Sequence, residues 1–557
     1  MFYSYLSSWS SKMEKIILNY PSLLSFLINL FILTFAYSVF TVQFQTLDDI
    51  GMMLANSGIV LTKQPTEDIF YLHIFVSMFL KKLYLTFPTI NWYPILFSST
   101  LFLAYWQLGR ILFKKYPKFI TLVLYLSFFV VCALKNFIFL QFTIVAAVLA
   151  ITGFVTIISE FNSQKTINYC IAFAFILLSS FIRFHSLLLV CLLVSPFLLF
   201  NLMQVKSNKI RLIQVFFLFV SLSVTYLCVY YHESHYSYYK NFVYKFVQFN
   251  DYDKLKDARS DVKEEVLKTV NWSQNDMDLM HSWFCMDSKT YSIQKQQTAL
   301  DIIADSSYIN IGKKAVHSID TFGAILKNRY AAFSIILFII LMIFCDKSKY
   351  KIILATLFVI TSITVLMVFF LKPPPERVFF PMFDYLCFLP LLFIRPVEES
   401  LLGKSISRYF NPHYLLLIVT VLFAYKMNLL YKNSIRLKEN NEQLRQWMSK
   451  LPTKGRTYIS WGASFMFNSI LPFENKDYLR DINVIVSIPQ PFLFNVDTVP
   501  TDLITNPTTY VFVRTTYGID INLYIKYMKE HYNKEVTVAE ENIDLLNEIK
   551  ILKFSAR

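Results

Sequence analysis

The chain has 557 residues and a net charge of +15, with 55% hydrophobic and only 16% charged residues. Ordinary soluble domains carry about 25% charged residues, and a single apolar core stops growing near about 250–300 residues. So much apolar sequence excludes a soluble globular protein. With only 10 Gly and 7 Cys, the chain is neither collagen-like nor a disulfide scaffold. The composition predicts a polytopic membrane protein.

Apolar segments of about 20 residues, the length that crosses a bilayer as a helix, recur along the chain. The first follows a polar start and lacks a cleavage signature, so we expect it to remain as an uncleaved span. Eleven spans are predicted, at 22–42, 92–113, 118–134, 137–158, 168–182, 185–203, 212–231, 332–345, 352–371, 378–395 and 413–432.

Basic residues cluster in alternate connections between these spans. Such clusters mark the cytoplasmic side of a membrane, so we expect the N-terminus in the cytoplasm and, with an odd number of spans, the C-terminus outside. This pattern explains the positive charge without a nucleic-acid partner. The clusters are Lys12 and Lys15; Arg110, Lys114, Lys115 and Lys118; Lys206, Lys209 and Arg211; Lys347, Lys349 and Lys351; and Arg395, Lys404 and Arg408.

The segment 67–87 is apolar at helical spacing, but a crossing there would break the alternation of basic clusters. We therefore expect a helix that lies flat at the outer surface of the membrane, which its Lys81–Lys82 pair also favours. Residues 1–432 then form the transmembrane domain, with a first outer loop at 43–91 and a large outer loop at 232–331.

The tail, 433–557, is predicted to be an outer domain. A charged helical stretch opens it, and strand-like runs then alternate with helix-like runs, which indicates a small α/β domain. The charged stretch is 434–450; the strand-like runs are 457–461, 482–488 and 509–513; and the helix-like runs are 523–532 and 540–549.

Two adjacent carboxylates, Asp48 and Asp49, follow the first predicted span almost immediately. Carboxylates at a membrane boundary are costly to desolvate, which favours a functional role. An ordinary solvated loop with a turn at Gly51 is the competing interpretation. Glu67 is a third candidate, although an acidic residue in the first turn of a helix capped by Thr66 has a structural explanation of its own.

Cationic candidates lie at the predicted outer ends of later spans. Arg183 and His185 interrupt a long apolar stretch, and Lys372 and Arg377 flank three prolines between the ninth and tenth spans. A guanidinium that faces the interior of a helix bundle suits a phosphate group. Interfacial snorkelling of Arg183, and a purely topological role for the Glu376–Arg377 pair, are the competing interpretations.

Other chemistry has less support in the sequence. His232 and His235 lack the spacing of a zinc protease, and we expect them to be solvated loop residues; no metal site is predicted. The sequence contains no P-loop, dinucleotide-binding glycine motif, serine-hydrolase elbow or Cys/His cluster. This argues against ATP-driven transport and hydrolase chemistry.

The order of a first outer loop with an Asp pair, a flat helix and an outer C-terminal domain resembles the GT-C superfamily of integral membrane glycosyltransferases. The resemblance implies an α-helical polytopic fold and a polyprenyl-phosphate sugar as donor. It is carried by Leu47-Asp48-Asp49-Ile50 through Ser57-Gly58, Pro65-Thr66-Glu67, Pro88-Thr89-Ile90-Asn91-Trp92-Tyr93, and Asn271-Trp272-Ser273-Gln274-Asn275-Asp276 with Trp283-Phe284.

The resemblance also implies a mechanism. An Asp of the first outer loop acts as general base for an acceptor hydroxyl, and cations stabilise the departing lipid phosphate. The implied partners are membrane lipid, the lipid-linked sugar and a glycan or glycolipid acceptor at the outer face of a bacterial inner membrane, with any divalent-cation requirement left open. The catalytic candidates are Asp48, Asp49 and Glu67, and the phosphate-binding candidates are Arg183, His185, Lys372 and Arg377.

Three alternatives stay open. An O-antigen-type polymerase or ligase would hold a diphosphate lipid with outer-side arginines. A polysaccharide flippase or other transporter should show broken spans or charges at mid-depth, whereas Gly is scarce here and the charges gather at the ends of the predicted spans. A non-catalytic envelope scaffold would not depend on the acidic pair.

Overall fold

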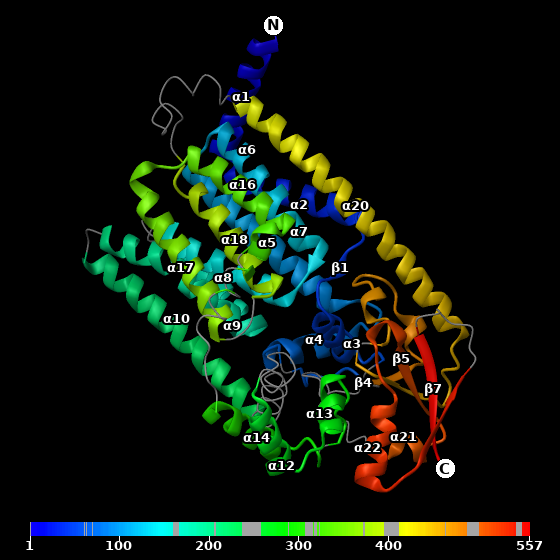
Figure 1. Cartoon of the computed structure of the whole chain (residues 1–557). Coiled ribbons are helices and arrows are strands. Elements are labelled where there is room, and N and C mark those ends of the chain that lie inside the picture. The colour runs from blue at the N-terminus through cyan, green and yellow to red at the C-terminus, as the bar shows by residue number, and fades with distance from the viewer. Residues whose placement is uncertain are drawn as a thin grey trace. The chain divides into compact units, whose positions relative to one another are not determined.

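The chain, described by a computed structural model, divides into two compact units, and Figure 1 labels their elements. Unit 1 comprises Met1–Gln45, Tyr93–Tyr230 and Ile311–Leu437, and unit 2 comprises Thr46–Trp92, Tyr231–Asn310 and Lys438–Arg557. The residues described are 2–60, 62, 64–69, 71–159, 166–204, 208–236, 258–287, 289–306, 316, 320–321, 323–370, 374–394, 412–462, 464–486, 501–541 and 549–557.

Unit 1 is built from helices with one short pair of strands. Helices α5, α10 and α20 extend along the chain into segments of unit 2. The elements are α1 (Phe2–Asn19), α2 (Pro21–Val39), β1 (Gln43–Phe44), α5 (Trp92–Lys115), α6 (Phe119–Phe128), a π-helical turn η1 (Phe129–Ala133), α7 (Leu134–Ile138), β2 (Phe139–Leu140), α8 (Phe142–Ser159), α9 (Thr166–Gln204), α10 (Asn208–His235), α16 (Arg329–Ile343), η3 (Lys347–Lys349), α17 (Tyr350–Phe370), α18 (Glu376–Leu391) and α20 (Pro412–Lys450).

Helix α8 lies at the centre of unit 1. It carries no charged residue and nearly all its side chains are buried, as expected for a helix that is apolar all round. Helix α9 packs closely against it at Gly153, where an added Cβ would lie 2.7 Å from Cγ1 of Ile176. Strands β1 and β2 pair in parallel, with Phe44 opposite Leu140, and so join the end of α2 to the end of α7.

Among the described residues, seven helices are long and apolar enough to cross a membrane. Helices also cover most of each of the eleven predicted segments; the exact number of crossings stays a prediction. The seven are Pro21–Val39, Trp92–Lys115, Phe119–Ile138, Phe142–Ser159, Ile167–Met203, Val215–His235 and Lys347–Val368.

Unit 2 combines small helices with a sheet. The helices from the first two segments are α3 (Leu47–Ser57), α4 (Ile74–Thr86), α12 (Ser260–Val270), α13 (Gln274–His281) and α14 (Ile293–Ser306). The tail adds β3 (Thr457–Ser460), η5 (Phe467–Ser469), η6 (Asp477–Leu479), β4 (Asn483–Val486), α21 (Asp502–Thr505), β5 (Thr509–Arg514), η7 (Thr515–Tyr517), α22 (Asn522–Tyr532), β6 (Val536–Glu540) and β7 (Ile549–Ala556).

The sheet of the tail has the strand order β4-β3-β5-β7-β6 in the part of the chain that the structure describes. Strand β3 pairs in parallel with β4 and β5, and β7 pairs antiparallel with β5 and β6. Apolar side chains of β3, β5 and β7 share one buried cluster with Tyr524, Tyr527 and Met528 of α22. Helix α22 is thereby fixed on the sheet.

Two of the predicted elements are wrong at their ends. Helix α4 begins at Ile74 rather than at residue 67. The backbone N–H of Ile69 bonds to the carbonyl of Glu67 in a turn, and the N-cap residue is His73, whose side chain accepts from the backbone N–H of Phe75. The predicted helix 540–549 has strand residues at both ends, since Glu540 closes β6 and Ile549 opens β7; residues 542–548 lie outside the described residues.

The prediction of solvated loop histidines is also wrong for His232. This residue is 8% exposed and lies in the last turns of α10. Its Nδ1 accepts a hydrogen bond from the backbone N–H of Ile74 at 3.1 Å, and its ring stacks on that of His73. His232 therefore satisfies a free donor at the start of α4.

Candidate active site

The acidic pair opens helix α3. Thr46 is the N-cap residue, and Asp48 and Asp49 both lie in the first turn, where the helix dipole favours negative charge. Asp49 is fully buried, and its Oδ2 accepts a hydrogen bond from Thr46 Oγ1 at 2.6 Å. Asp48 is only half-buried. Because successive helix residues point about 100° apart, the two carboxylates face different directions.

Glu67 lies in the turn before α4 and pairs with Lys81 of that helix. Its pKa is lowered, chiefly by the hydrogen bond from Lys81. A carboxylate whose charge is stabilised by a neighbouring ammonium is a weaker proton acceptor than an unpaired one. The contact of Glu67 with Lys81 therefore ties the turn to the helix.

The chain segment that leads into the acidic pair is anchored within unit 1. Gln45, three residues before Asp48, donates from Nε2 to Oε2 of Glu376 at 3.1 Å. Asn328, the N-cap residue of α16, donates to Oε1 of the same carboxylate at 3.0 Å. The carboxylate thus joins the end of the first apolar helix to the starts of α16 and α18. Arg377 is the next residue of α18.

Arg183 separates two helices that form the long element α9. Its backbone is extended, with φ −160° and ψ 100°, so the helical course breaks between the predicted spans 168–182 and 185–203. Its guanidinium lies over the ring of Phe142 at 5.5 Å. His185, two residues later, is exposed, and its ring contacts that of Phe184 edge-on.

Arg183 and Arg377 lie at the same end of unit 1. Phe142, which Arg183 contacts, begins α8 two residues after β2, and β2 pairs with β1 just before Gln45. Gln45 in turn binds Glu376, beside Arg377. The predicted cation Lys372 lies outside the described residues, as do Lys206, Arg395, Lys404 and Arg408 of the basic clusters.

A buried polar cluster in unit 1 was not predicted. Asp384, 3% exposed, accepts hydrogen bonds from the hydroxyl of Tyr330 and from Asn136 Nδ2, the latter at 3.0 Å. The ammonium of Lys135 lies over the rings of Tyr330 and Phe380, at 4.5 and 3.0 Å from their centroids. The expectation that charges gather only at the ends of spans is therefore wrong for Asp384, which interrupts the predicted span 378–395.

A second half-buried cation, Lys426, contacts the irregular turn η1. Lys426 of α20 donates from Nζ to the carbonyl of Val130 at 2.8 Å and also to that of Val131. A π-helical turn disturbs the regular pattern of backbone hydrogen bonds, and such turns are frequent at functional sites. A charged residue inside an apolar run was the available sequence signal for both Asp384 and Lys426.

No family model matches the chain, and no curated protein matches it either. Among solved structures, the chain is similar to ArnT from Cupriavidus metallidurans in the apo state, with 10% identity, a TM-score of 0.40, and 95% of this chain and 97% of that chain covered. The same coverage and identity, with a TM-score of 0.41, hold for ArnT from that organism bound to undecaprenyl phosphate. The function must be argued from this chain's own residues.

Proposed function

We propose that this chain is an integral membrane glycosyltransferase that moves a sugar from a polyprenyl-phosphate donor to a hydroxyl of a cell-envelope acceptor on the outer face. The observation that carries the proposal is the acidic pair at the start of α3, the next helix after the apolar helix α2, with one carboxylate buried and the other half-buried. A carboxylate of this kind can act as general base for an acceptor hydroxyl that attacks the sugar.

In this proposal Asp48 is the base and Asp49 positions it. Asp49 is buried and engaged with Thr46, so it holds the first turn of α3 rather than meeting substrate. Asp48 takes the proton of the acceptor hydroxyl as its oxygen forms a bond to the anomeric carbon. The bond from that carbon to the phosphate oxygen breaks, and the polyprenyl phosphate leaves with the electron pair. A single displacement of this kind inverts the anomeric centre.

The leaving group carries negative charge, so cations near it lower the barrier. Arg183 and Arg377 are proposed for this role because they lie at the same end of unit 1, the end to which Gln45 is anchored. Lys135 is added to them, since its half-buried ammonium lies within the polar cluster that includes Tyr330. Nucleotide recognition has no motif in the sequence, in agreement with a lipid-linked donor.

The test compares cells that lack the chain's gene and carry wild-type or variant protein. Mass spectrometry of extracted glycans and lipid-linked sugars should show that Asp48→Asn loses a sugar-sized mass from the glycan and accumulates a monophosphate-linked sugar. Asp261→Asn is the matched control, because Asp261 also lies in the first turn of a helix but on an exposed surface. Unchanged glycans in cells with normally inserted Asp48→Asn protein would contradict the proposal.

The same extracts distinguish the alternatives. Accumulation of a diphosphate-linked oligosaccharide would indicate a polymerase or ligase. A transporter is the second candidate, and the buried Asp384 is the observation that favours it, because ionisable residues inside membrane helices often line transport pathways. Transport would be indicated if Asp384→Asn abolished export of the lipid-linked sugar while Asp48→Asn left the glycan intact.

A further inference from the structure

The junction between α12 and α13 in unit 2 holds the side chains of Ser273 and Asp276 in fixed positions. Helix α12 ends at Val270, and its C-cap residue Asn271 has a left-handed conformation (φ 54°) that turns the chain. Trp272 is buried, and its indole N–H donates to the carbonyl of Thr290 at 2.7 Å. Ser273 then caps α13, in a reciprocal arrangement with Asp276. The capping box uses Oδ2 of Asp276, which accepts from the backbone N–H of Ser273 at 2.8 Å.

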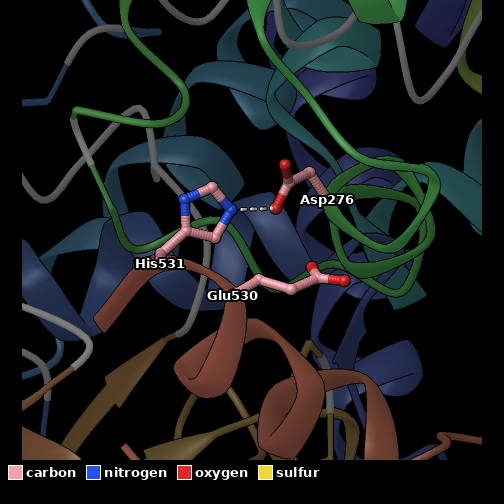
Figure 2. Close-up of side chains that lie close together, drawn as sticks. All are labelled: Asp276, Glu530 and His531. Atoms are coloured by element: carbon pink, nitrogen blue, oxygen red, sulfur yellow. Dashed lines mark hydrogen bonds and ion pairs between the residues drawn. The ribbon is translucent and has the colours of Figure 1, made fainter. Parts of the chain in front are cut away.

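The other oxygen of Asp276 faces the C-terminal end of α22. Figure 2 shows the carboxylate of Asp276 and the imidazole of His531 pointing at each other, with Glu530 extending toward them from the neighbouring position. Oδ1 of Asp276 lies 2.7 Å from Nε2 of His531, and the Asp276 side chain is fully buried. One ligand atom from each of the three residues lies within 4.8 Å of the others.

Asn275 supplies an independent observation that points to a ligand. It is 2% exposed, and its amide nitrogen contacts the cluster, because Nδ2 donates to Oε2 of Glu530 at 3.3 Å and to the carbonyl of Leu523 at 3.1 Å. Its Oδ1 is buried and has no hydrogen-bond partner among the described residues. Buried polar atoms are nearly always hydrogen-bonded, and a bound ion or water is one explanation of an atom that lacks a partner.

Hydrogen bonding alone does not account for the whole arrangement. It explains the Asp276–His531 contact and the contacts of Glu530 Oε2, which accepts from Ser273 Oγ at 3.0 Å and from Asn275 Nδ2 at 3.3 Å. It leaves Oδ1 of Asn275 without a partner among the described residues. Glu530 has one cationic neighbour on its own helix, Lys526, and their closest atoms are 3.7 Å apart. Such an exposed pair contributes little.

The imidazole is held in place for a ligand role. The ring of Tyr527 stacks on that of His531, with centroids 4.5 Å apart and planes inclined by 34°. Tyr527 is itself fixed by its hydroxyl, which donates to Oδ2 of Asp287 at 2.5 Å. The packing against Tyr527 thus fixes the orientation of the imidazole.

We propose that Asp276, Glu530 and His531, together with the amide oxygen of Asn275, bind a divalent transition metal ion. One imidazole nitrogen with carboxylate and amide oxygens is a donor set of the zinc or manganese class rather than of the thiolate-rich class. The ion would cross-link α13 to α22 and so join the buried cluster around Met277 and Met280 to that of the sheet. Its role is structural, and it is independent of the transferase reaction.

The test uses the full-length chain, purified in detergent with any histidine tag removed and stripped of metal with a chelator. Isothermal titration with Zn²⁺ and with Mn²⁺ should give one site per chain for at least one of these ions, and that ion should raise the unfolding temperature. His531→Gln should weaken binding by more than about 100-fold, beyond the 10–100-fold typical of groups that only support a ligand. Glutamine keeps an N–H donor for Asp276, so a purely hydrogen-bonded contact would survive this change.

His281→Gln is the matched control. It makes the same substitution on α13, outside the proposed ligand set, and should bind metal as the wild type does. Circular dichroism establishes that each variant is folded. The proposal is overturned if the stripped wild type binds neither ion, or if His531→Gln and Asp276→Asn, both folded, bind as tightly as His281→Gln.

Discussion

Two helices of unit 2, α3 and α13, begin with acidic residues in the first turn, and they use them differently. In α13 one carboxylate, Asp276, serves both the cap and the contact with His531. In α3 the two tasks fall to two residues, since Asp49 engages Thr46 at the cap and Asp48 lies half-buried beside it. In α3 the first turn therefore holds a second carboxylate beside the one that engages Thr46, and that second carboxylate, Asp48, is the proposed base.

The largest effect is expected from separating the two aspartates of α3. Asp48→Asn should reduce sugar transfer by about 10²–10⁴-fold, the contribution of a general base, with little change in unfolding temperature. Asp49→Asn should lower the unfolding temperature, because its buried carboxylate is replaced beside Thr46. Transfer measured per folded molecule and thermal unfolding in detergent separate the two results. If both variants lost sugar transfer and stability to the same extent, Asp48 and Asp49 would not have separate catalytic and structural roles.

Most helices could be predicted from hydropathy because a bilayer span has a fixed length and composition. The break near Arg183 was equally visible, since a charged residue between two apolar runs marks their junction. Helix starts were less certain. Helix α4 begins seven residues later than predicted, because the chain turns at Glu67–Ile69 and His73, not Thr66, is the N-cap residue.

Contacts between distant segments could not be predicted. The bond from Gln45 to Glu376 joins residues 331 positions apart, and Asp384 meets Asn136 across 248 positions. A sequence shows the polar residues but not which of them meet, because that depends on how the helices pack. The Asp276–His531 contact was missed for the same reason, although both side chains were visible.

Asp384 in unit 1 is also a buried carboxylate, but it lies in the interior of α18 and not in its first turn. Tyr330→Phe removes a hydroxyl that donates to it, and this should cost about 1–3 kcal/mol of stability because a buried acceptor loses a partner. Tyr385→Phe is the matched control, since its buried hydroxyl has no hydrogen-bond partner among the described residues. Thermal or denaturant unfolding measures both. Equal stability of the two variants would show that Asp384 does not depend on Tyr330.

Asp287 supplies a pH-dependent test in unit 2. Burial alone would raise its pKa, but hydrogen bonds from Tyr527, Tyr532 and neighbouring groups outweigh burial and lower it. A carboxyl with a lowered pKa in the folded state adds stability above its unfolded value, near about 4, and that stability is lost as the pH falls further. The unfolding temperature of the wild type should therefore fall more steeply below about pH 4 than that of Asp287→Asn. Parallel curves would exclude this contribution.

The smallest effect is expected at Glu67, a carboxylate whose contact with Lys81 indicates a structural role. The side chains of Lys81 and Glu67 are 33% and 31% exposed, so water and salt screen the ion pair. Lys81→Met should cost at most about 1 kcal/mol, and the cost should shrink in high salt. Glu67→Gln should leave sugar transfer close to wild type, because the hydrogen bond from Lys81 lowers the pKa of Glu67 and weakens it as a base. Loss of transfer in a stably folded Glu67→Gln variant would move the general base from α3 to the turn before α4.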